Sequence, residues 1–495
     1  MNMGRGAGWM TENRSIKKIL IANRGEIVLR IIRTVREMGL ESVVVYEKPD
    51  LDEYFIRMAD EAILIGDGPR KDYLDIDRMI WAARKSGADA IHPGIGFLAE
   101  NMDFSEACEK AGITFIGPPA DVIRNTGDKV AARELMEKAG IPVIPGTKAL
   151  PSGSAAVKEA QAFGREHGYP IMLKSPLGGG GRGIRRVKSE AELVGRLLRV
   201  RSEARKAFRD ESIYVEKCLE APRHVEIPML VDRYGNIVQL ASRDCSIQRR
   251  HQKLIGIAPA NIAPDLLEGL REAAVTAVRA AGAVNAVTVE FLVDERNRKF
   301  WFMEINTRLQ VEHVATEELI NIDIVREQIR TAQGHRLNIP PERTAFTGKA
   351  IQVRINCEDP KNKFMPDGGK VVTLYLPPGG PGIRLDGMIY NGYRIPADYD
   401  SLMVKMTVRA FNWKQAVNRL KNALDLFLIA GPKTTIPFYR ALCDEPDFRA
   451  EKFDTTYIET HPDLFSYLEP GRKITKLEQF LMDIYSSEIF PQGWL

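Results

Sequence analysis

Two acidic side chains fall on neighbouring predicted strands, where their spacing lets them face each other. Glu290 lies within the apolar segment 288–292 and Glu304 within the segment 302–306, with a polar turn at 295–298 between them. A hairpin through that turn sets Glu290 opposite Glu304. Like charges directly opposite each other destabilise a sheet, and apolar neighbours add to the cost. A divalent cation between the carboxylates removes the conflict. The alternative is a solvent-facing strand pair with longer-range salt bridges.

The same register predicts two further neighbours of this carboxylate pair. It sets Leu292 opposite Phe302, and it puts Asn306 on the face that carries Glu304, because side chains alternate along a strand. Magnesium binds proteins through a few carboxylates and completes its shell with phosphate oxygens and water. We therefore expect Mg²⁺ (or Mn²⁺) between Glu290 and Glu304, with Asn306 on the same face.

Three polar residues follow the second strand at alternate positions, namely Arg308, Gln310 and Glu312. An extended backbone would point all three side chains the same way. A guanidinium fork, an amide and a carboxylate together suit a small planar oxyanion that must lose a proton. Polar edge strands show the same pattern, but its place beside the predicted metal hairpin favours an anion site.

A run of glycines at 178–181 and Gly183 follows Lys174. It formally matches the dinucleotide fingerprint G-x-G-x-x-G, but that fingerprint needs a helix to begin at the glycines, and 184–187 is typical of a strand. No Lys-Ser/Thr pair closes it as in a P-loop. A strand, a glycine loop and a basic strand predict a mobile flap whose N–H groups cover a polyphosphate. A flexible linker is the alternative.

Several other polar residues leave their interpretation open. The basic segment 243–253 suits either a solvated loop or the wall of an anion site. Lys129, which follows Gly127-Asp128, is by itself a residue at the start of a helix. His224 and His313 are by themselves ordinary strand or helix histidines.

Composition limits the class of protein. The chain has 495 residues, a net charge of +4, 44% hydrophobic residues and 27% charged residues, which is typical of a globular protein and excludes a disordered one. The charge is too small to indicate a nucleic-acid partner. No apolar run of about 18 residues predicts a membrane span. The five cysteines are scattered, which favours reduced thiols in a cytoplasm.

The pattern of elements predicts an α/β and α+β protein. After a loose leader at 1–15, strands and helices alternate through 16–127, which predicts a parallel, Rossmann-like sheet covered on both faces. Segment 128–347 is mixed α+β with antiparallel hairpins, and its part from about 146 to 217 contains the predicted flap. Segment 348–465 is β-rich and closes on a helix at 413–425. A tail at 466–495 follows, with a short amphipathic helix expected near 475–485.

Taken together, these segments resemble the biotin carboxylase family, within the ATP-grasp fold, from about Lys17 to Phe465. The resemblance rests on ordered motifs along the chain. They are Ile21-Ala22-Asn23-Arg24-Gly25-Glu26, His92-Pro93-Gly94, Lys174 with the glycine run, Arg243 to Lys253, Glu304 to Glu312, Arg354-Ile355-Asn356 and Tyr399-Asp400-Ser401-Leu402. It implies a pre-ATP-grasp domain, an ATP-grasp domain with a mobile lid and a C-terminal biotin carboxylase domain.

The resemblance also implies a role for each matching residue. The ATP site would comprise Lys129, Lys174, Gly179, Gly180, Gly181, Glu216, Lys217, Leu219, His224, Gln248 and His251. The bicarbonate site would comprise Lys253, Arg308, Gln310, the Val311 backbone and Glu312. Glu290, Glu304 and Asn306 would hold the magnesium. Glu312 would act as the general base, and Arg354, with Gly96 nearby, would bind biotin and steady its enolate; Lys253 and Arg308 complete the catalytic set.

The implied reaction is the ATP-dependent carboxylation of biotin through carboxyphosphate. The chain contains no Met-Lys-Met biotinylation motif, so biotin is expected on a separate carrier protein, and the second expected partner is a carboxyltransferase subunit. A homodimer is expected as well. The final acceptor stays open among acetyl-CoA, another acyl-CoA, pyruvate and another 2-oxo acid.

The chain departs from the family pattern in three places. Ile95 stands where the family usually has tyrosine, near biotin, Gly256-Ile257 stands where an acidic pair is usual, and Thr307 stands where proline is usual. Two other functions therefore remain open. One is an ATP-grasp ligase that activates a different carboxylate, and the other is a nucleotide-binding subunit with little catalytic activity.

Overall fold

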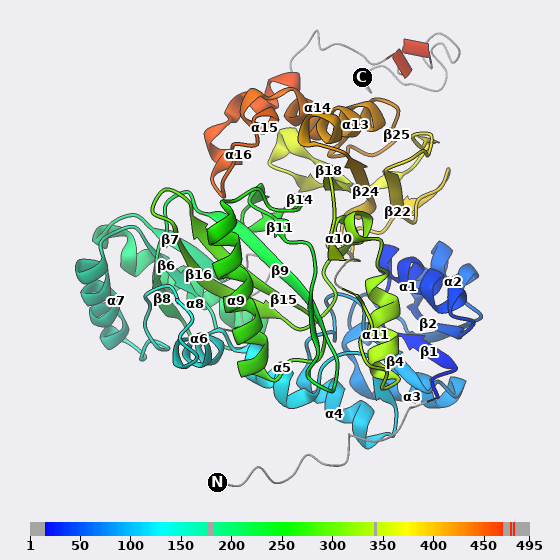
Figure 1. Ribbon diagram of the computed structural model, residues 1–495, viewed down its shortest axis with the longest axis horizontal. Helices are drawn as coiled ribbons and strands as arrows, with labels where there is room; N and C mark the ends of the chain where they lie inside the picture. The colour runs from blue at the N-terminus through cyan, green and yellow to red at the C-terminus, as the bar shows by residue number, and fades with distance from the viewer. Residues whose placement is uncertain (1–14, 177–182, 341–343, 469–475, 478, 481–495) are drawn as a thin grey trace.

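The structure is a computed structural model that describes residues 15–176, 183–340, 344–468, 476–477 and 479–480. Figure 1 shows an N-terminal α/β unit beside a large central sheet, a small lid unit on the opposite side, and a C-terminal unit that extends the sheet. Residues 1–14 of the predicted leader lie outside the described residues, as do the predicted flap glycines 178–181 and most of the predicted tail helix.

The N-terminal unit contains a parallel sheet in the order β3-β2-β1-β4-β5. Alternate strand residues face opposite sides: Ile19 and Ile21 pack with α1, whereas Leu20 packs with the core that includes α3 and α4. The predicted Rossmann-like sheet is thus present. Its elements are β1 (Lys18–Ile21), α1 (Glu26–Glu37), β2 (Glu41–Glu47), α2 (Tyr54–Met58), β3 (Glu61–Gly66), α3 (Ile76–Ser86), β4 (Ala90–His92), α4 (Met102–Lys110), β5 (Thr114–Phe115) and α5 (Ala120–Gly127).

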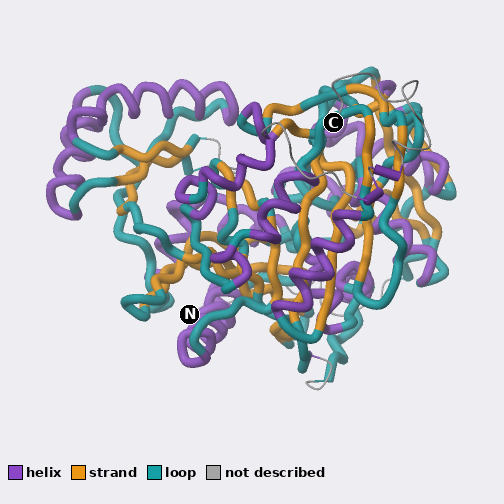
Figure 2. Tube along the Cα trace, turned by 90° about the horizontal axis from the view of Figure 1, so that it is seen from above, coloured by secondary structure: helices purple, strands orange, loops and turns teal. Residues whose placement is uncertain are grey.

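A three-stranded antiparallel sheet, in the order β7-β6-β8, forms the lid unit at one end of the molecule (Figure 2). It has a core of its own, in which Ala160, Leu173 and Leu197 are buried together. Its elements are α7 (Ser154–His167), β6 (Ile171–Lys174), β7 (Ile184–Val187), α8 (Glu190–Phe208) and β8 (Tyr214–Lys217).

The central sheet runs in the order β16-β15-β9-β11-β14-β17-β24-β22, with β10 paired to β9. It continues without a break from segment 128–347 into segment 348–465, because β14 pairs with β17. Its strands are β9 (Arg223–Val231), β10 (Ile237–Gln239), β11 (Arg243–Asp244), β14 (Ile255–Ala258), β15 (Asn285–Asp294), β16 (Lys299–Asn306), β17 (Lys349–Asn356), β22 (Ile383–Gly387) and β24 (Leu402–Ala410).

Helices and short hairpins cover this sheet and complete the C-terminal unit. The predicted helix at 413–425 is α13, residue for residue. The remaining elements are α6 (Lys129–Lys138), β12 (Gln248–Arg249), β13 (Gln252–Lys253), α9 (Pro264–Ala281), α10 (His313–Ile320), α11 (Ile324–Ala332), β18 (Glu358–Asp359), β19 (Met365–Pro366), β20 (Gly369–Lys370), β21 (Thr373–Tyr375), β23 (Arg394–Ile395), α13 (Trp413–Asp425), β25 (Leu428–Ala430), α14 (Ile436–Asp444), α15 (Pro446–Arg449) and α16 (Tyr457–Thr460).

The hairpin of β15 and β16 confirms one predicted pair and corrects another. Glu290 pairs with Glu304, as predicted, but Phe302 pairs with Phe291 and not with Leu292. A register shift between Glu290 and Phe291 leaves Met303 as an extra residue on β16. A β-bulge of this kind bends the strand and increases its twist, and alternation along the sequence cannot show where it falls.

The segment after β16 also differs from its prediction. Residues 307–312 form a loop that ends in a turn, and Glu312 has φ −82° and ψ 7°, which is far from extended. Glu312 instead precedes α10 as its N-cap residue. Convergence of Arg308, Gln310 and Glu312 therefore cannot come from strand alternation. Separately, no helix in the described ranges is long and apolar enough to cross a membrane.

Candidate functional site

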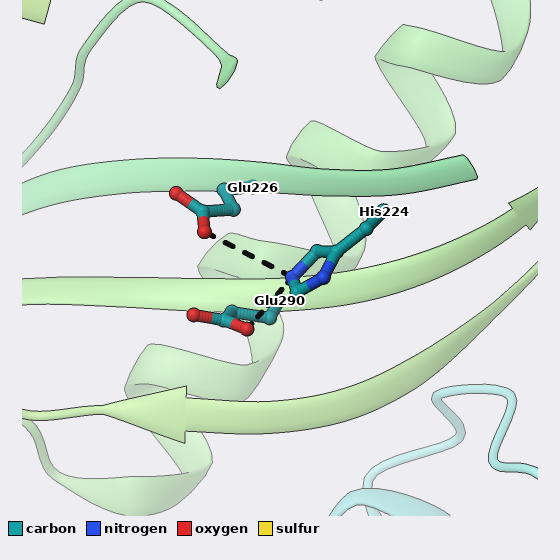
Figure 3. Close-up of side chains that lie close together, drawn as sticks. All are labelled: His224, Glu226 and Glu290. Carbon is teal, nitrogen blue, oxygen red and sulfur yellow. Dashed lines mark hydrogen bonds and ion pairs between the residues drawn. The ribbon is translucent and has the colours of Figure 1, made fainter. Parts of the chain in front are cut away.

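Three carboxylates lie in one row across neighbouring strands of the central sheet. Glu226 on β9 pairs with Glu290 on β15, which pairs in turn with Glu304 on β16. Figure 3 shows Glu226 and Glu290 on adjacent strands, with His224 of β9 reaching between them. Glu226 and Glu290 are buried, at 0% and 1% exposure. Such a row of buried acids requires positive partners.

Lys253 is the main positive partner of this row. It comes from the short β12–β13 hairpin, and its Nζ lies 2.6 Å from Glu290 Oε1 and 3.0 Å from Glu312 Oε1. It also donates to Glu226. Burial by itself would lower the pKa of Lys253, but these carboxylates outweigh burial and raise that pKa well above its usual value. Lys253 is therefore charged at the centre of the site.

Glu290 receives a further set of donors. Asn306 Nδ2 and Gln310 Nε2 donate to its Oε1 at 2.8 and 2.7 Å. Burial by itself would raise the pKa of Glu290, but Lys253 and His224 outweigh burial and hold that pKa below its usual value. Glu290 is therefore ionised, as a metal ligand would have to be.

Lys129 is the partner of Glu304. Asp128 caps α6 by accepting from the N–H groups of Val130 and Ala131 at 2.8 and 2.9 Å, which makes Lys129 the first residue of the helix, as its position in the sequence predicts. From there its ammonium donates to Glu304. Burial by itself would raise the pKa of Glu304, but the charge of Lys129 outweighs burial and lowers that pKa.

The hydrogen bonds of His224 indicate which of its ring nitrogens carries the proton. Gln248 Nε2 lies 2.6 Å from His224 Nδ1 and 2.7 Å from the Cys245 carbonyl oxygen. An amide NH₂ group can donate to both, which leaves Nδ1 as an acceptor and places the proton on Nε2. His224 Nε2 then donates to Glu290 Oε2 at 2.7 Å. His224, which the resemblance assigns to the ATP site, thus contacts Glu290, and Gln248, assigned to the same site, contacts His224.

The loop 307–312 brings its three polar residues to the same site through long-range contacts. Gln310 bonds Glu290, and its Oε1 accepts from the buried Arg243. Arg308 Nη2 donates to Asn306 Oδ1 at 3.0 Å, and its Nε donates to Glu100 Oε2 at 2.8 Å. Glu100 lies in the N-terminal unit, 208 positions away.

Glu312 lies between two cations. Arg354 on β17 donates from Nη2 to Glu312 Oε2 at 2.9 Å, and Lys253 contacts the other oxygen. Burial by itself would raise the pKa of Glu312, but Lys253, Arg354 and Arg243 outweigh burial and lower that pKa well below its usual value. The carboxylate is thus ionised and held at both oxygens.

The other predicted ATP residues lie in two places. Lys174 on β6 pairs with Glu216 on β8, inside the lid sheet. Lys217 and Leu219 instead line a cavity of about 840 Å³ where the lid meets the central sheet and the C-terminal unit. Neither Lys129 nor the row of carboxylates lines that cavity.

Three of the remaining predicted residues lie in turns and loops. His251 is exposed in the β12–β13 turn. Gly96 lies in the loop after β4 with a positive φ of 67°, and the Val311 carbonyl oxygen accepts from Gln352 Nε2 at 3.3 Å. Gly179, Gly180 and Gly181 lie outside the described residues.

Sequence reasoning missed Glu226, Arg243 as a site residue, and Glu100. For Glu226 a signal existed, because His224 and Glu226 alternate along β9 just before its apolar segment 227–231. Arg243 fell inside a run of basic residues that gave no reason to single it out. No local pattern could have indicated Glu100, because its partner Arg308 is distant in the chain.

Three sequence families match successive parts of the chain. They are described as "Biotin carboxylase, N-terminal domain" (residues 15–123), "Carbamoyl-phosphate synthase L chain, ATP binding domain" (128–340) and "Biotin carboxylase C-terminal domain" (352–460). The chain is 46% identical over 448 residues to biotin carboxylase 1 of Bacillus subtilis, which covers 90% of this chain and 99% of that protein.

The chain belongs to the biotin carboxylase family. The expected family, fold class and enzyme class are thereby confirmed. The small subunit of 2-oxoglutarate carboxylase from Hydrogenobacter thermophilus is 45% identical over 454 residues, 92% of this chain and 95% of that one. The chain thus has a relative of similar length that is one subunit of a larger enzyme.

Solved structures of family members share the fold. The biotin carboxylase domain dimer of the same 2-oxoglutarate carboxylase, in complex with MgADP, ADP and bicarbonate, is 45% identical. The match covers 92% of this chain and 100% of that one, with a TM-score of 0.89. A Campylobacter jejuni biotin carboxylase in a β,γ-ATP complex is 43% identical, with 90% and 99% coverage and a TM-score of 0.86.

Proposed function

We propose that this protein uses ATP and bicarbonate to carboxylate biotin carried on a separate carrier protein. The observation that supports this most directly is the arrangement around Lys253. One ammonium group contacts carboxylates from two strands and from the N-cap of α10, and the last of these, Glu312, also binds Arg354. Cations and acids so placed suit an anion that must be bound and deprotonated.

The donor set fits the expected metal. Glu290 and Glu304 are paired, ionised carboxylates with Asn306 beside them, and hard oxygen ligands of this kind suit Mg²⁺ or Mn²⁺. These three residues would hold the ion, which would supply positive charge against the phosphate oxygens of ATP. Lys129 and Lys174 would bind the same phosphates, with Gly179–Gly181 closing over them.

Lys253, Arg308, Gln310 and the Val311 backbone would bind bicarbonate, with Glu312 as the base. A carboxylate held by two cations is a weak base, because both cations stabilise its charged form. An anion bound by Lys253 would also be stabilised by the positive charge of Lys253. Less of that charge would then stabilise the Glu312 carboxylate, and Glu312 would become more basic. Deprotonated bicarbonate would then attack the γ-phosphorus of ATP, displace ADP and give carboxyphosphate. Carboxyphosphate would break down to CO₂ and phosphate, the phosphate would take the N1 proton of biotin, and the biotin enolate would capture the CO₂.

Arg354, which binds Glu312, would also bind biotin later in the reaction. Its guanidinium is partly exposed on the Glu312 side of β17, where it can meet a second anion, the biotin enolate. Gly96 would contact the biotin ring. Glu216, Lys217, Leu219, His224, Gln248 and His251 would hold the rest of the nucleotide. Closure of the lid would keep water from the reactive intermediate.

The assembly and location follow from the same proposal. We expect two partners, a biotin carboxyl carrier protein and a carboxyltransferase subunit, because a relative of similar length is itself one subunit of a carboxylase. We expect a homodimer, because the solved Hydrogenobacter domain is a dimer. Domains would divide near residues 127 and 347. All five cysteines are free, which suits a cytoplasmic protein.

ATP hydrolysis measured with and without bicarbonate, in the presence of free biotin, tests the function. We expect ADP release that requires bicarbonate and increases with biotin. Release that needs a different carboxylic acid would indicate another ATP-grasp ligase. Tight ATP binding without bicarbonate-dependent turnover would indicate a nucleotide-binding subunit.

A further inference from the structure

His313 is the first residue of α10 and directly follows Glu312. It is buried, at 1% exposure, and its ring Nδ1 lies 2.6 Å from the main-chain carbonyl oxygen of Gln310. The backbone N–H of His313 donates to the same carbonyl oxygen at 3.3 Å. One residue therefore contacts the Gln310 carbonyl twice and closes the turn that contains Val311 and Glu312.

The contacts of the His313 ring determine where its proton lies. A carbonyl oxygen can only accept, so Nδ1 carries the hydrogen that it shares with Gln310. Burial, together with the charges of Lys405 and Arg30, lowers the pKa of His313 well below its usual value, so the ring is neutral and has this one N–H. Within the described ranges Nε2 makes no hydrogen bond, and Glu317 Oε2 at 4.0 Å is too far away for one. The ring N–H therefore acts on the Gln310 carbonyl.

The side chain of Gln310 is held separately, by Arg243. Gln310 Oε1 accepts from Arg243, which turns Nε2 towards Glu290 Oε1 at 2.7 Å. The opposite orientation of the amide is unfavourable, because Arg243 has only donors and would then face the Gln310 NH₂ group. Gln310 is thus fixed at both of its carbonyl groups, by Arg243 at the side chain and by His313 at the main chain.

We propose that His313 is a positioning residue for the turn that binds bicarbonate. Its ring N–H holds the main chain of Gln310, so that the Gln310 amide and the Val311 backbone keep fixed places before the anion arrives. A turn without this bond would have to be ordered when bicarbonate binds, and that ordering weakens binding. The inference rests on the proposed function, which assigns Gln310 and Val311 to bicarbonate.

The test compares His313→Leu with His313→Asn in steady-state kinetics of bicarbonate-dependent ATP turnover. Leucine and asparagine have nearly the same shape, but only asparagine carries a donor, and its Nδ2 falls near the place of the ring Nδ1. Loss of the bond to a buried carbonyl should raise KM for bicarbonate roughly 5- to 10-fold in His313→Leu. KM for ATP should stay within about twofold, because Lys129 and Lys174 lie on other elements. His313→Asn should bring KM for bicarbonate back to within about twofold of wild type.

The two KM values separate positioning from loss of folded protein, because KM does not depend on how much of the enzyme is folded. A wild-type KM for bicarbonate in His313→Leu would overturn the inference. So would an asparagine variant that is as impaired as the leucine variant, because the size of the ring and not its N–H would then matter. If His313→Leu is not recovered folded, His313→Gln replaces it. Glutamine places its amide nitrogen near the ring Nε2, away from Gln310, so KM for bicarbonate should rise as in the leucine variant.

The matched control is His335→Leu, which makes the same substitution at an exposed histidine after α11 and should leave both KM values unchanged. The wild type distinguishes the two levels of the argument. Absence of bicarbonate-dependent turnover in the wild type would reject the proposed function. Bicarbonate-dependent turnover in the wild type, with the same KM for bicarbonate in His313→Leu, would reject only the role of His313.

Discussion

Among the single residues of the site, Lys253 contributes most to neutralising the buried carboxylates. Glu226, Glu290 and Glu312 all depend on its ammonium, and the first two are almost fully buried. Removing one partner from a buried cluster of charges leaves the others uncompensated, which typically costs about 3–5 kcal/mol. The same residue that would bind the substrate anion therefore also keeps three acids together.

The proposed role of Glu312 as the general base has a direct test. Glu312→Gln keeps the size of the side chain but removes the proton acceptor, so bicarbonate-dependent turnover should fall by at least about 100-fold. ATP binding, measured by calorimetry, should persist because Glu312 contacts none of the residues assigned to the phosphates. Turnover close to wild type would remove Glu312 as the base. Glu318→Gln on the same helix, where Glu318 pairs with Arg384 at 3.4 Å, is the matched control.

At the scale of elements, the loop before α4 of the N-terminal unit reaches into the central site. Glu100 Oε2 accepts from Arg308 Nε at 2.8 Å, and Glu100 Oε1 accepts from the Thr307 N–H at 3.3 Å. Burial by itself would lower the pKa of Arg308, but Glu100 outweighs burial and raises that pKa. Two contacts from one carboxylate thus fix both the backbone and a side chain of the loop 307–312.

This contact predicts a change in bicarbonate affinity. In Glu100→Gln the charged partner of Arg308 is lost, the guanidinium is less firmly oriented, and KM for bicarbonate should rise several-fold while KM for ATP stays near wild type. Steady-state kinetics with each substrate varied would measure the difference. Equal changes in both KM values would argue against a specific role. Glu106→Gln, which removes the exposed pair with Arg124, should leave both values unchanged.

At the scale of the whole molecule, buried polar contacts join the first and last units of the chain. Tyr393 donates to Glu53 Oε1 at 2.9 Å, Tyr399 donates to Glu47, and Arg24 lies 3.7 Å over the ring of Tyr399. Figure 1 shows these N-terminal and C-terminal elements meeting beside the central sheet. Residues more than 300 positions apart therefore share one buried interface.

This interface predicts a pH-dependent stability. Burial raises the pKa of Glu53 from 4.5 to about 7, despite the opposing charge of Arg24. Between those two pKa values the folded state binds more protons than the unfolded state. The stability that this group contributes is therefore present below pH 4.5 and is lost as the pH rises to 7. The free energy of unfolding falls by roughly 3 kcal/mol over this range. Glu53→Gln stays neutral, so its melting temperature relative to wild type should increase from about pH 5 to about pH 8.

Thermal melts across this pH range test the prediction. A difference between Glu53→Gln and wild type that stays constant with pH would contradict it. Glu61→Gln is the control, because Glu61 is a half-exposed carboxylate on β3 that pairs with Lys18 at 3.2 Å.

Local patterns in the sequence determined much of the architecture. The spacing of Glu290 and Glu304 around a polar turn predicted their pairing, the alternation of strand and helix patterns predicted the parallel N-terminal sheet, and the helix at 413–425 was found at its correct bounds. These features depend on backbone periodicity and on turns between neighbouring residues, which a short stretch of chain specifies by itself. The ordered motifs, in turn, identified the family.

Only the tertiary structure decided how the charges of the site are balanced. It placed Lys253 among three acids and brought Glu100 into contact with Arg308. It also placed Glu312 close to Gly256, and a bulge changed the predicted pairing of Leu292. Each of these depends on contacts between distant segments, or on one extra residue absorbed by a strand. Residue spacing carries no information about such contacts, because they arise when separate elements pack against one another.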